Sequence, residues 1–344
     1  MLEKISRYRS AIMGLATIWV VLFHWCENFT FAPPLESLAR CGYGGVDVFL
    51  LLSGFGLYIG YNKYSSVWPF YIKRFSRLYP IYLFIIIVAF VLKHDYSISH
   101  MLLASLGIGF YLPVGNLPWY EWYVPTIFCL YLLFPFIYKT IQKSIKYIGV
   151  FLLLAFIMIG VLVFLQKGSY QILAISRIPI FLIGVYMGWL YKNQKDLQPT
   201  ANVKGFLLIS VSLLLYFIEL DVVSFYDYTI LWKNALFWLP FMIIAPGFTL
   251  LAGLGLHHLP CANAFFSKIG EVSLEVYLLH MLVIELSKDF ISSILCNNLW
   301  MNYLFFALFV IVVLSIALLL KYALKPISNG LLKVGSGKII RQQK

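Results

Sequence analysis

Long apolar segments are the feature that most limits the folds open to this 344-residue chain. A helix needs about 17–25 predominantly apolar residues to cross the hydrocarbon core of a bilayer. Such stretches recur along the whole length, and only 12% of the residues are charged, roughly half the share typical of a soluble domain. The sequence therefore predicts an all-α, polytopic transmembrane bundle of about ten helices. The predicted spans are 11–26, 43–62, 76–95, 122–139, 147–166, 172–191, 204–220, 234–254, 268–288 and 300–324.

A shorter apolar stretch, 98–113, contains two glycines and ends on a proline. We expect it to form a re-entrant or interfacial segment rather than an eleventh span. The first span lacks a small-residue cleavage site, so we interpret it as a retained helix. The polar interruptions are too short to bury a core of their own. We therefore expect one transmembrane domain over 1–326, followed by a basic cytoplasmic tail at 327–344.

The net charge of +12 could indicate a nucleic-acid partner or an anionic surface. If the N-terminus is cytoplasmic, however, most of the 26 lysines and arginines fall in the inner loops and tails. Basicity then reflects topology: a multi-pass protein of the cell membrane, both termini cytoplasmic, with the lipid bilayer and not nucleic acid as its partner. The five scattered cysteines indicate neither a metal site nor a disulfide framework, although pairing of Cys26 with Cys41 stays open.

Four ionisable residues fall at similar depth on four predicted helices: His24, Asp47, Arg177 and His280. Each has an ordinary structural explanation. Asp47 suits a helix start, Arg177 can extend toward the interface, and His280 can be a packing histidine. Ser53, among glycines, is more typical of helix packing than of a nucleophile. Their convergence nevertheless favours a site or pathway, because intramembrane ionisable groups gather around such places.

Basic residues are candidates for phosphate binding, and aromatic residues are candidates for sugar binding. Arg74 and Arg77 are three apart and share a helical face, and with Lys73 they could hold phosphates or simply follow the positive-inside rule. Aromatic residues in the outer loops can stack on sugars, but they equally suit an interfacial belt. These aromatics are Phe29, Phe31, Trp119, Tyr120, Trp122 and Tyr123.

Six stretches, taken together and in order, resemble the acyltransferase-3 family of integral membrane acyltransferases. Members of that family have about ten transmembrane helices and pass an acyl group from cytoplasmic acyl-CoA to hydroxyls of extracytoplasmic glycans or lipids. The resemblance implies acyl-CoA, most often acetyl-CoA, as donor substrate, with no permanently bound cofactor and a glycan or glycolipid as acceptor. The stretches are TIWVVLFH (17–24), GGVDVFLLLSGF (44–55), KRFSRLYP (73–80), WYVPTIFCLYLLFP (122–135), SRIPIFLIG (176–184) and GEVSLEVYLLH (270–280).

The resemblance also implies residue roles. His24 corresponds to the essential histidine of the family and is our candidate general base, with Asp47 orienting its ring. Arg74 and Arg77 correspond to the arginine pair that would hold the CoA phosphates. Ser53 lies in the motif around SGF and is a weaker candidate for a covalent acyl relay. We further expect Ser53, Trp122, Tyr123, Arg177 and His280 to contact the substrates.

Two departures from the family pattern bear on this interpretation. Met13 stands where the family usually has an arginine, while Arg9 lies one helical turn closer to the cytoplasm on the same face. We expect Arg9 to supply the missing charge at the CoA end. Ile127 stands where many members have a glutamate. A proton-coupled transporter or flippase of a glycan or anionic substrate is the alternative function, and a sensor without chemistry is a third. No esterase-like domain is expected after the helices.

Overall fold

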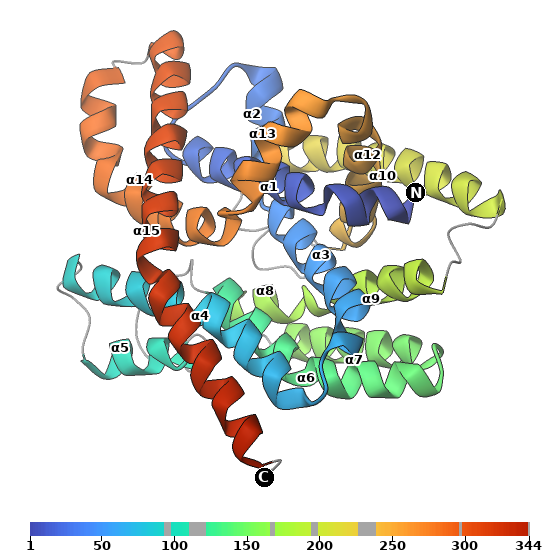
Figure 1. The fold of residues 1–344 in the computed structure, drawn as a ribbon. Helices are drawn as coiled ribbons and strands as arrows, with labels where there is room; N and C mark the ends of the chain where they lie inside the picture. Colours follow the sequence, from blue (N-terminus) through green and yellow to red (C-terminus); the bar gives the residue numbers. More distant parts are fainter. Residues whose placement is uncertain are drawn as a thin grey trace.

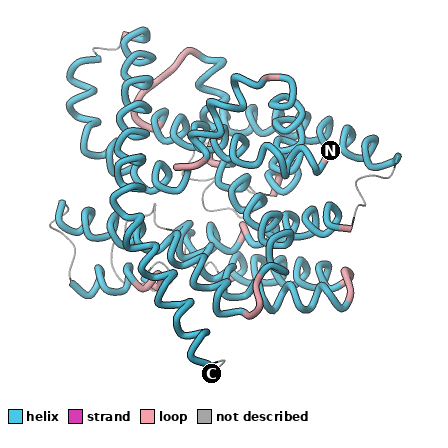
Figure 2. Tube along the Cα trace, in the orientation of Figure 1, coloured by secondary structure: helices cyan, strands magenta, loops and turns pink. Residues whose placement is uncertain are grey.

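The computed structural model describes residues 1–92, 98–109, 122–165, 169–193, 199–225, 239–295 and 298–342. Within these ranges the chain forms helices joined by turns and short loops, and no β-strand occurs among the described residues (Figure 2). The prediction of an all-α chain is confirmed. Trp119, Tyr120 and the end of the predicted segment 98–113 lie outside the described residues.

Nine helical segments of the described part are long and apolar enough to cross a bilayer, so the chain is a multi-pass membrane protein. Two of them include a short neighbouring element: a 3₁₀ turn (Tyr61–Lys63) continues α3, and the end of α8 (Ser169–Ile175) leads into α9. The segments lie in α1 (Leu2–Cys26), α3 (Gly44–Gly60), α4 (Val67–Leu92), α6 (Tyr123–Lys143), α7 (Tyr147–Phe164), α9 (Ile178–Lys192), α10 (Pro199–Phe225), α12 (Phe241–His258) and α15 (Leu299–Gln342).

The predicted span 268–288 accounts for the difference from ten. It overlaps the end of α13 (Pro260–Gly270) and much of α14 (Ser273–Leu295). α14 carries four charged residues and is not among the nine apolar segments. It packs against α1, α4 and α15, and its later part is largely exposed, with Leu286 61% and Phe290 66% exposed. The charged residues are Glu275, Glu285, Lys288 and Asp289.

Two short helices complete the described elements. α2 (Pro33–Arg40) follows α1, and α5 (Ile98–Ser105) falls in the segment predicted not to span. Eight residues of α5 extend only about 12 Å, well short of the hydrocarbon core. A left-handed glycine, Gly107 (φ 70°), follows α5 where a residue with a Cβ would be strained. Cys26 and Cys41 are both free thiols.

The helices fall into two groups in Figure 1, with α4–α9 on one side and α1, α2, α10, α12 and α13 on the other. α3 runs between the groups, packing against α9 on one side and against α1 and α12 on the other. α15 runs along both groups and contacts α4 and α14. At about 66 Å, its 44 residues exceed the bilayer core, and the helix continues without a break past residue 326.

Glycines set the closest helix contacts in the core. A Cβ on Gly54 of α3 would overlap the carbonyl oxygen of Phe181 in α9, and one on Gly184 would overlap that of Leu51. Small residues allow backbones to approach closely, which is the main route to tight packing between membrane helices. This contact fixes α3, which carries Asp47 and Ser53, against α9, which begins next to Arg177.

Candidate active site

Three cavities follow one another along α1, α3, α4 and α14. We call them the vestibule, the arginine cavity and the histidine cavity, with volumes of about 900, 50 and 20 Å³. Arg9, Met13 and Arg77 line both the vestibule and the arginine cavity, and Tyr277 lines both the arginine and the histidine cavities. Each cavity therefore shares at least one wall with the next.

The order of the cavities follows the order of residues along α1. Arg7 lines the vestibule, Met13 lines the first two cavities, and His24 lines the last. Along α14 the same order runs from Glu275 in the vestibule to His280 in the histidine cavity. From Arg9 to His24 the helix rises about 22 Å. The vestibule and the histidine cavity thus lie toward opposite ends of the helix bundle.

The vestibule is large and strongly basic. Its lining combines six cationic side chains with only two acidic ones, Glu271 and Glu275. Lys73, one of the predicted phosphate-binding residues, lies here and places its Nζ 5.8 Å from the centre of the Tyr64 ring. The cationic residues are Arg7, Arg9, Lys73, Arg77, Lys321 and Lys325.

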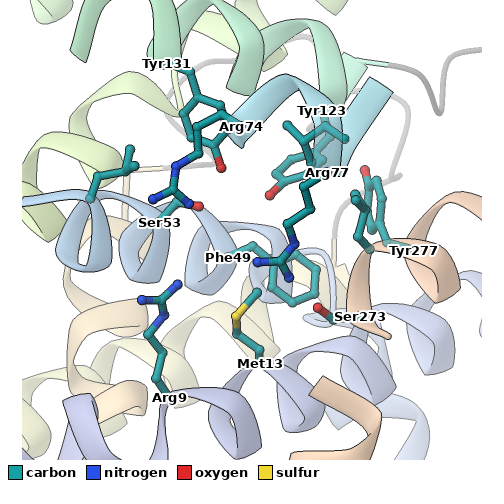
Figure 3. Close-up of a pocket in the computed structure, with 13 residues that line it drawn as sticks. Arg9, Met13, Phe49, Ser53, Arg74, Arg77, Tyr123, Tyr131, Ser273 and Tyr277 are labelled. Carbon is teal, nitrogen blue, oxygen red and sulfur yellow. The ribbon is translucent and has the colours of Figure 1, made fainter. Parts of the chain in front are cut away.

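The arginine cavity brings together the three predicted arginines. Arg9 from α1 and Arg74 and Arg77 from α4 extend into the same space, as Figure 3 shows. No aspartate or glutamate lines this cavity, and the buried Nε of Arg74 has no hydrogen-bond partner among the described residues. Buried cations normally need a counter-charge. The cavity therefore has the composition of an anion site.

The position of Arg9 in the arginine cavity depends on a glycine on the facing helix. A Cβ on Gly56 of α3 would overlap the Arg9 guanidinium, so the absence of a side chain at this position makes room for the charge. Met13 lines the same cavity one turn further along α1. Arg9 and Met13 therefore line the same cavity, so Arg9 can supply a positive charge where the family usually has an arginine at position 13.

Ser53 and Tyr123 also line the arginine cavity, together with Tyr131 and Tyr277 (Figure 3). Ser53 therefore lies beside the arginines, whereas the candidate base lines the next cavity. Trp122, next to Tyr123 in sequence, lines the histidine cavity instead. The two adjacent aromatics thus face different chambers.

The histidine cavity gathers His24, Trp122, Arg177 and His280. The His24 and His280 rings lie 5.1 Å apart between centroids. Tyr43, also in the lining, donates a hydrogen bond of 2.7 Å from its hydroxyl to Oε1 of Glu219 in α10. Nothing in the sequence indicated Glu219 here, because it lies at the end of an apolar segment, two residues before Asp221.

Asp47 forms a buried ion pair with Arg177 next to this cavity. Nε of Arg177 lies 3.0 Å from Oδ1 of Asp47, and the side chains are 1% and 3% exposed. The Arg177 guanidinium also lies 5.4 Å from the centre of the Trp122 ring. Arg177 is the residue that precedes α9, so its position follows from the tight packing of α9 on α3. The structure therefore gives Asp47 a partner that the sequence did not assign to it.

A carboxylate that the sequence analysis missed lies against His24. Nδ1 of His24 is 2.8 Å from Oε2 of Glu27, three residues further along the chain. Because a carboxylate only accepts hydrogen bonds, Nδ1 carries the hydrogen and Nε2 is the acceptor in the neutral ring. Spacing of three residues on a helix was the available signal. It was overlooked because the apolar segment ends at Cys26.

Comparison with known proteins gives the family. The family model described as an acyltransferase domain matches residues 11–322, which is most of the chain. ORF330 of Acidianus two-tailed virus, whose name provisionally calls it an acetyltransferase, is 26% identical over 212 residues. The match covers 58% of this chain and 62% of the viral protein, so it spans less than two thirds of that relative. No solved structure matches the chain. The chain belongs to the acyltransferase-3 family of integral membrane acyltransferases.

Proposed function

We propose that this chain is an O-acyltransferase that moves an acyl group, acetyl in the first instance, from cytoplasmic acyl-CoA to a hydroxyl of an extracytoplasmic glycan or glycolipid. The observation that carries the proposal is the arginine cavity, where three guanidiniums converge and no acidic side chain lines the space. It lies between a basic vestibule and a cavity that holds the candidate base.

Charge balance supports a polyanionic donor. Arg9, Arg74 and Arg77 line one small cavity and repel one another there, so a bound anion would relieve the repulsion. Guanidinium groups bind phosphate oxygens in bidentate fashion, and the phosphates of CoA provide several such oxygens. The vestibule, with its large volume and additional lysines, suits the nucleotide part of the donor.

The arrangement of cavities supports a donor that reaches inward. With the phosphates at the arginines, the pantetheine arm would extend past Tyr277, which lines both inner cavities. The thioester would then approach His24 although the nucleotide remains at the opposite end of α1. In this proposal the pantetheine arm spans the distance between a cytoplasmic donor and a base near the outer side.

In the proposed reaction, Nε2 of His24 takes the proton of the acceptor hydroxyl as its oxygen attacks the thioester carbonyl carbon. A C–O ester bond forms and the C–S bond breaks, so that CoA leaves as a thiolate. The imidazolium returns the proton to the sulfur, which yields the ester and CoA thiol. Neutral histidine suits this step near neutral pH, and a general base contributes about 10²–10⁴-fold in rate.

We propose Glu27 as the residue that holds His24 in the reactive tautomer, since its carboxylate accepts from Nδ1. Asp47 then acts indirectly, by fixing Arg177 in the wall of the histidine cavity. Ser53 lines the arginine cavity, and we propose that it contacts the donor there. We propose no covalent acyl-serine.

The same proposal fixes the orientation in the cell membrane. The vestibule opens among Arg7, Lys73, Lys321 and Lys325, near the N-terminal end of α1 and the later part of α15. Inner loops and tails are enriched in lysine and arginine. We therefore propose that both termini are cytoplasmic, with α14 as a tenth crossing, and that the histidine cavity lies toward the outer side.

The direct experiment measures transfer of labelled acetyl from acetyl-CoA by the protein in proteoliposomes. We expect His24→Ala to reduce transfer and thioester cleavage by about 10²–10⁴-fold. His258→Ala is the matched control, because His258 lies at the exposed end of α12, outside the three cavities. Undiminished thioester turnover by His24→Ala would exclude the base role. No turnover by any variant, with substrate movement across the membrane, would favour the transporter.

A further inference from the structure

His280, which lines the histidine cavity, has a buried acceptor nitrogen without a hydrogen-bond partner among the described residues. Its Nδ1 lies 3.2 Å from the carbonyl oxygen of Val276, and a carbonyl only accepts hydrogen bonds. Nδ1 therefore carries the ring hydrogen, which leaves Nε2 as an acceptor in the neutral ring. His280 is 1% exposed, and its Nε2 has no hydrogen-bond partner among the described residues.

An unsatisfied buried acceptor costs free energy, so its presence calls for a donor that arrives from elsewhere. The cavity beside it has a volume of about 20 Å³, which is room for a single water-sized group. A hydroxyl group fits this space, whereas a whole sugar ring does not. The sugar ring and the reacting hydroxyl would then lie at the mouth of the cavity, next to His24, whose side chain is 11% exposed.

Counting donors and acceptors shows what the two histidines can bind together. Neutral His24 and neutral His280 each have one acceptor nitrogen, Nε2 in both cases. One hydroxyl carries one hydrogen and can satisfy only one of these nitrogens. Their rings are 5.1 Å apart, the scale over which two hydroxyls on neighbouring carbons can each reach a different ring.

We propose that His280 receives a second hydroxyl of the acceptor, adjacent to the one that is acylated, so that the acceptor presents a vicinal diol. This inference rests on the proposed function, because His24 must hold the reacting hydroxyl. His280 is then a specificity-determining residue: it positions the acceptor and takes no proton in the reaction. Sugars with neighbouring free hydroxyls have this chemistry.

The test compares two acceptors that differ only in the second hydroxyl. The protein in proteoliposomes is supplied with labelled acetyl-CoA and either cis-1,2-cyclohexanediol or cyclohexanol, and ester formation is measured for each. Cyclohexanol would leave Nε2 of His280 without a hydrogen-bond partner. We therefore expect kcat/KM for the diol to exceed that for cyclohexanol by about 10- to 100-fold.

Two substitutions identify the residue responsible for that ratio. His280→Leu removes the acceptor nitrogen and should bring the ratio of the two kcat/KM values close to one. His280→Gln keeps an acceptor at about the position of Nε2 and should retain a clear preference for the diol. His258→Ala should give the ratio of the unmodified protein.

Equal use of the two alcohols by the unmodified protein would overturn the inference, and so would a ratio that His280→Leu leaves unchanged. Thioester cleavage that depends on His24, with neither alcohol esterified, would also overturn it. In each of these cases the proposed function survives. Loss of the proposed function would appear instead as thioester turnover that is independent of His24.

Discussion

The arginine cavity and the histidine cavity are neighbours that share Tyr277, yet their charges are balanced in different ways. In the arginine cavity three cations converge without an acid in the lining. Around the histidine cavity, Arg177 is paired with Asp47 and His24 with Glu27. Uncompensated charge favours binding of a charged ligand, whereas compensated charge favours binding of a neutral one.

The largest effect should come from breaking the compensated pair. Truncating one partner of a buried ion pair strands the other, which costs about 3–5 kcal/mol. We expect Arg177→Met to destabilise the folded protein by about that much, as measured by unfolding in detergent. Arg77→Met, which removes one of three like charges, should leave stability unchanged or higher.

The double variant Asp47→Leu with Arg177→Met provides the control. It removes both charges together and should recover much of the lost stability, because replacing a whole buried pair is often neutral. Equal destabilisation by Arg177→Met and Arg77→Met would contradict the contrast between the two cavities.

The next effect concerns Arg9, which supplies the third positive charge of the arginine cavity. Arg9→Ala should raise the KM for acetyl-CoA by about 10- to 100-fold, since hydrogen bonds to charged groups contribute about 1.5–3 kcal/mol. Met13 lines the same cavity, so Met13→Arg in the Arg9→Ala background should restore part of the affinity. Kinetics of acetyl transfer measure both. A double variant as weak as Arg9→Ala would show that the two positions do not serve the same ligand.

A smaller effect should follow from crowding Arg9 without removing it. Gly56→Ala places a methyl group where the Arg9 guanidinium lies, whereas a Cβ on Gly60 meets no atom within 4 Å. Because the guanidinium ends a flexible side chain, we expect it to move rather than the helices. The KM for acetyl-CoA should then rise less than in Arg9→Ala, and Gly60→Ala should have the KM of the unmodified protein. A large loss of thermal stability in Gly56→Ala would contradict this interpretation.

The smallest effect should come from Glu27. Its side chain is 32% exposed, and exposed ion pairs contribute only about 0.2–1 kcal/mol. We expect Glu27→Gln to lower kcat by about 2- to 5-fold while the KM for acetyl-CoA is unchanged, because Glu27 acts through His24 and not on the donor. Glu27→Asp should restore part of kcat. An increase in KM with kcat constant would exclude the orienting role.

Much of the fold was predictable because hydropathy over a helix length reports burial in a bilayer. The four ionisable residues His24, Asp47, Arg177 and His280 were predicted at similar depth, and the structure brings them together. Their pairing was not predictable, because depth along separate helices does not determine which faces meet. That depended on the glycine contacts between α3 and α9.

Two other results were beyond the sequence for different physical reasons. α14 was predicted as an apolar span, but its four charges set it apart from the nine most apolar segments, although it runs from the vestibule to the histidine cavity. Glu27 lies just past the last apolar residue of α1, so segment hydropathy assigned it to a loop. In the structure, Glu27 lies about one helical turn from His24 and within hydrogen-bond distance of its Nδ1.

The central claim is that the arginine cavity binds the donor while His24 performs the chemistry. Its most direct test measures acetyl-CoA binding and acetyl transfer in parallel for Arg77→Met and His24→Ala in the full-length protein. We predict that His24→Ala binds acetyl-CoA like the unmodified protein and loses about 10²–10⁴-fold in transfer, while Arg77→Met binds about 10- to 100-fold more weakly. Normal binding by Arg77→Met, or equal loss of binding in both variants, would contradict the account.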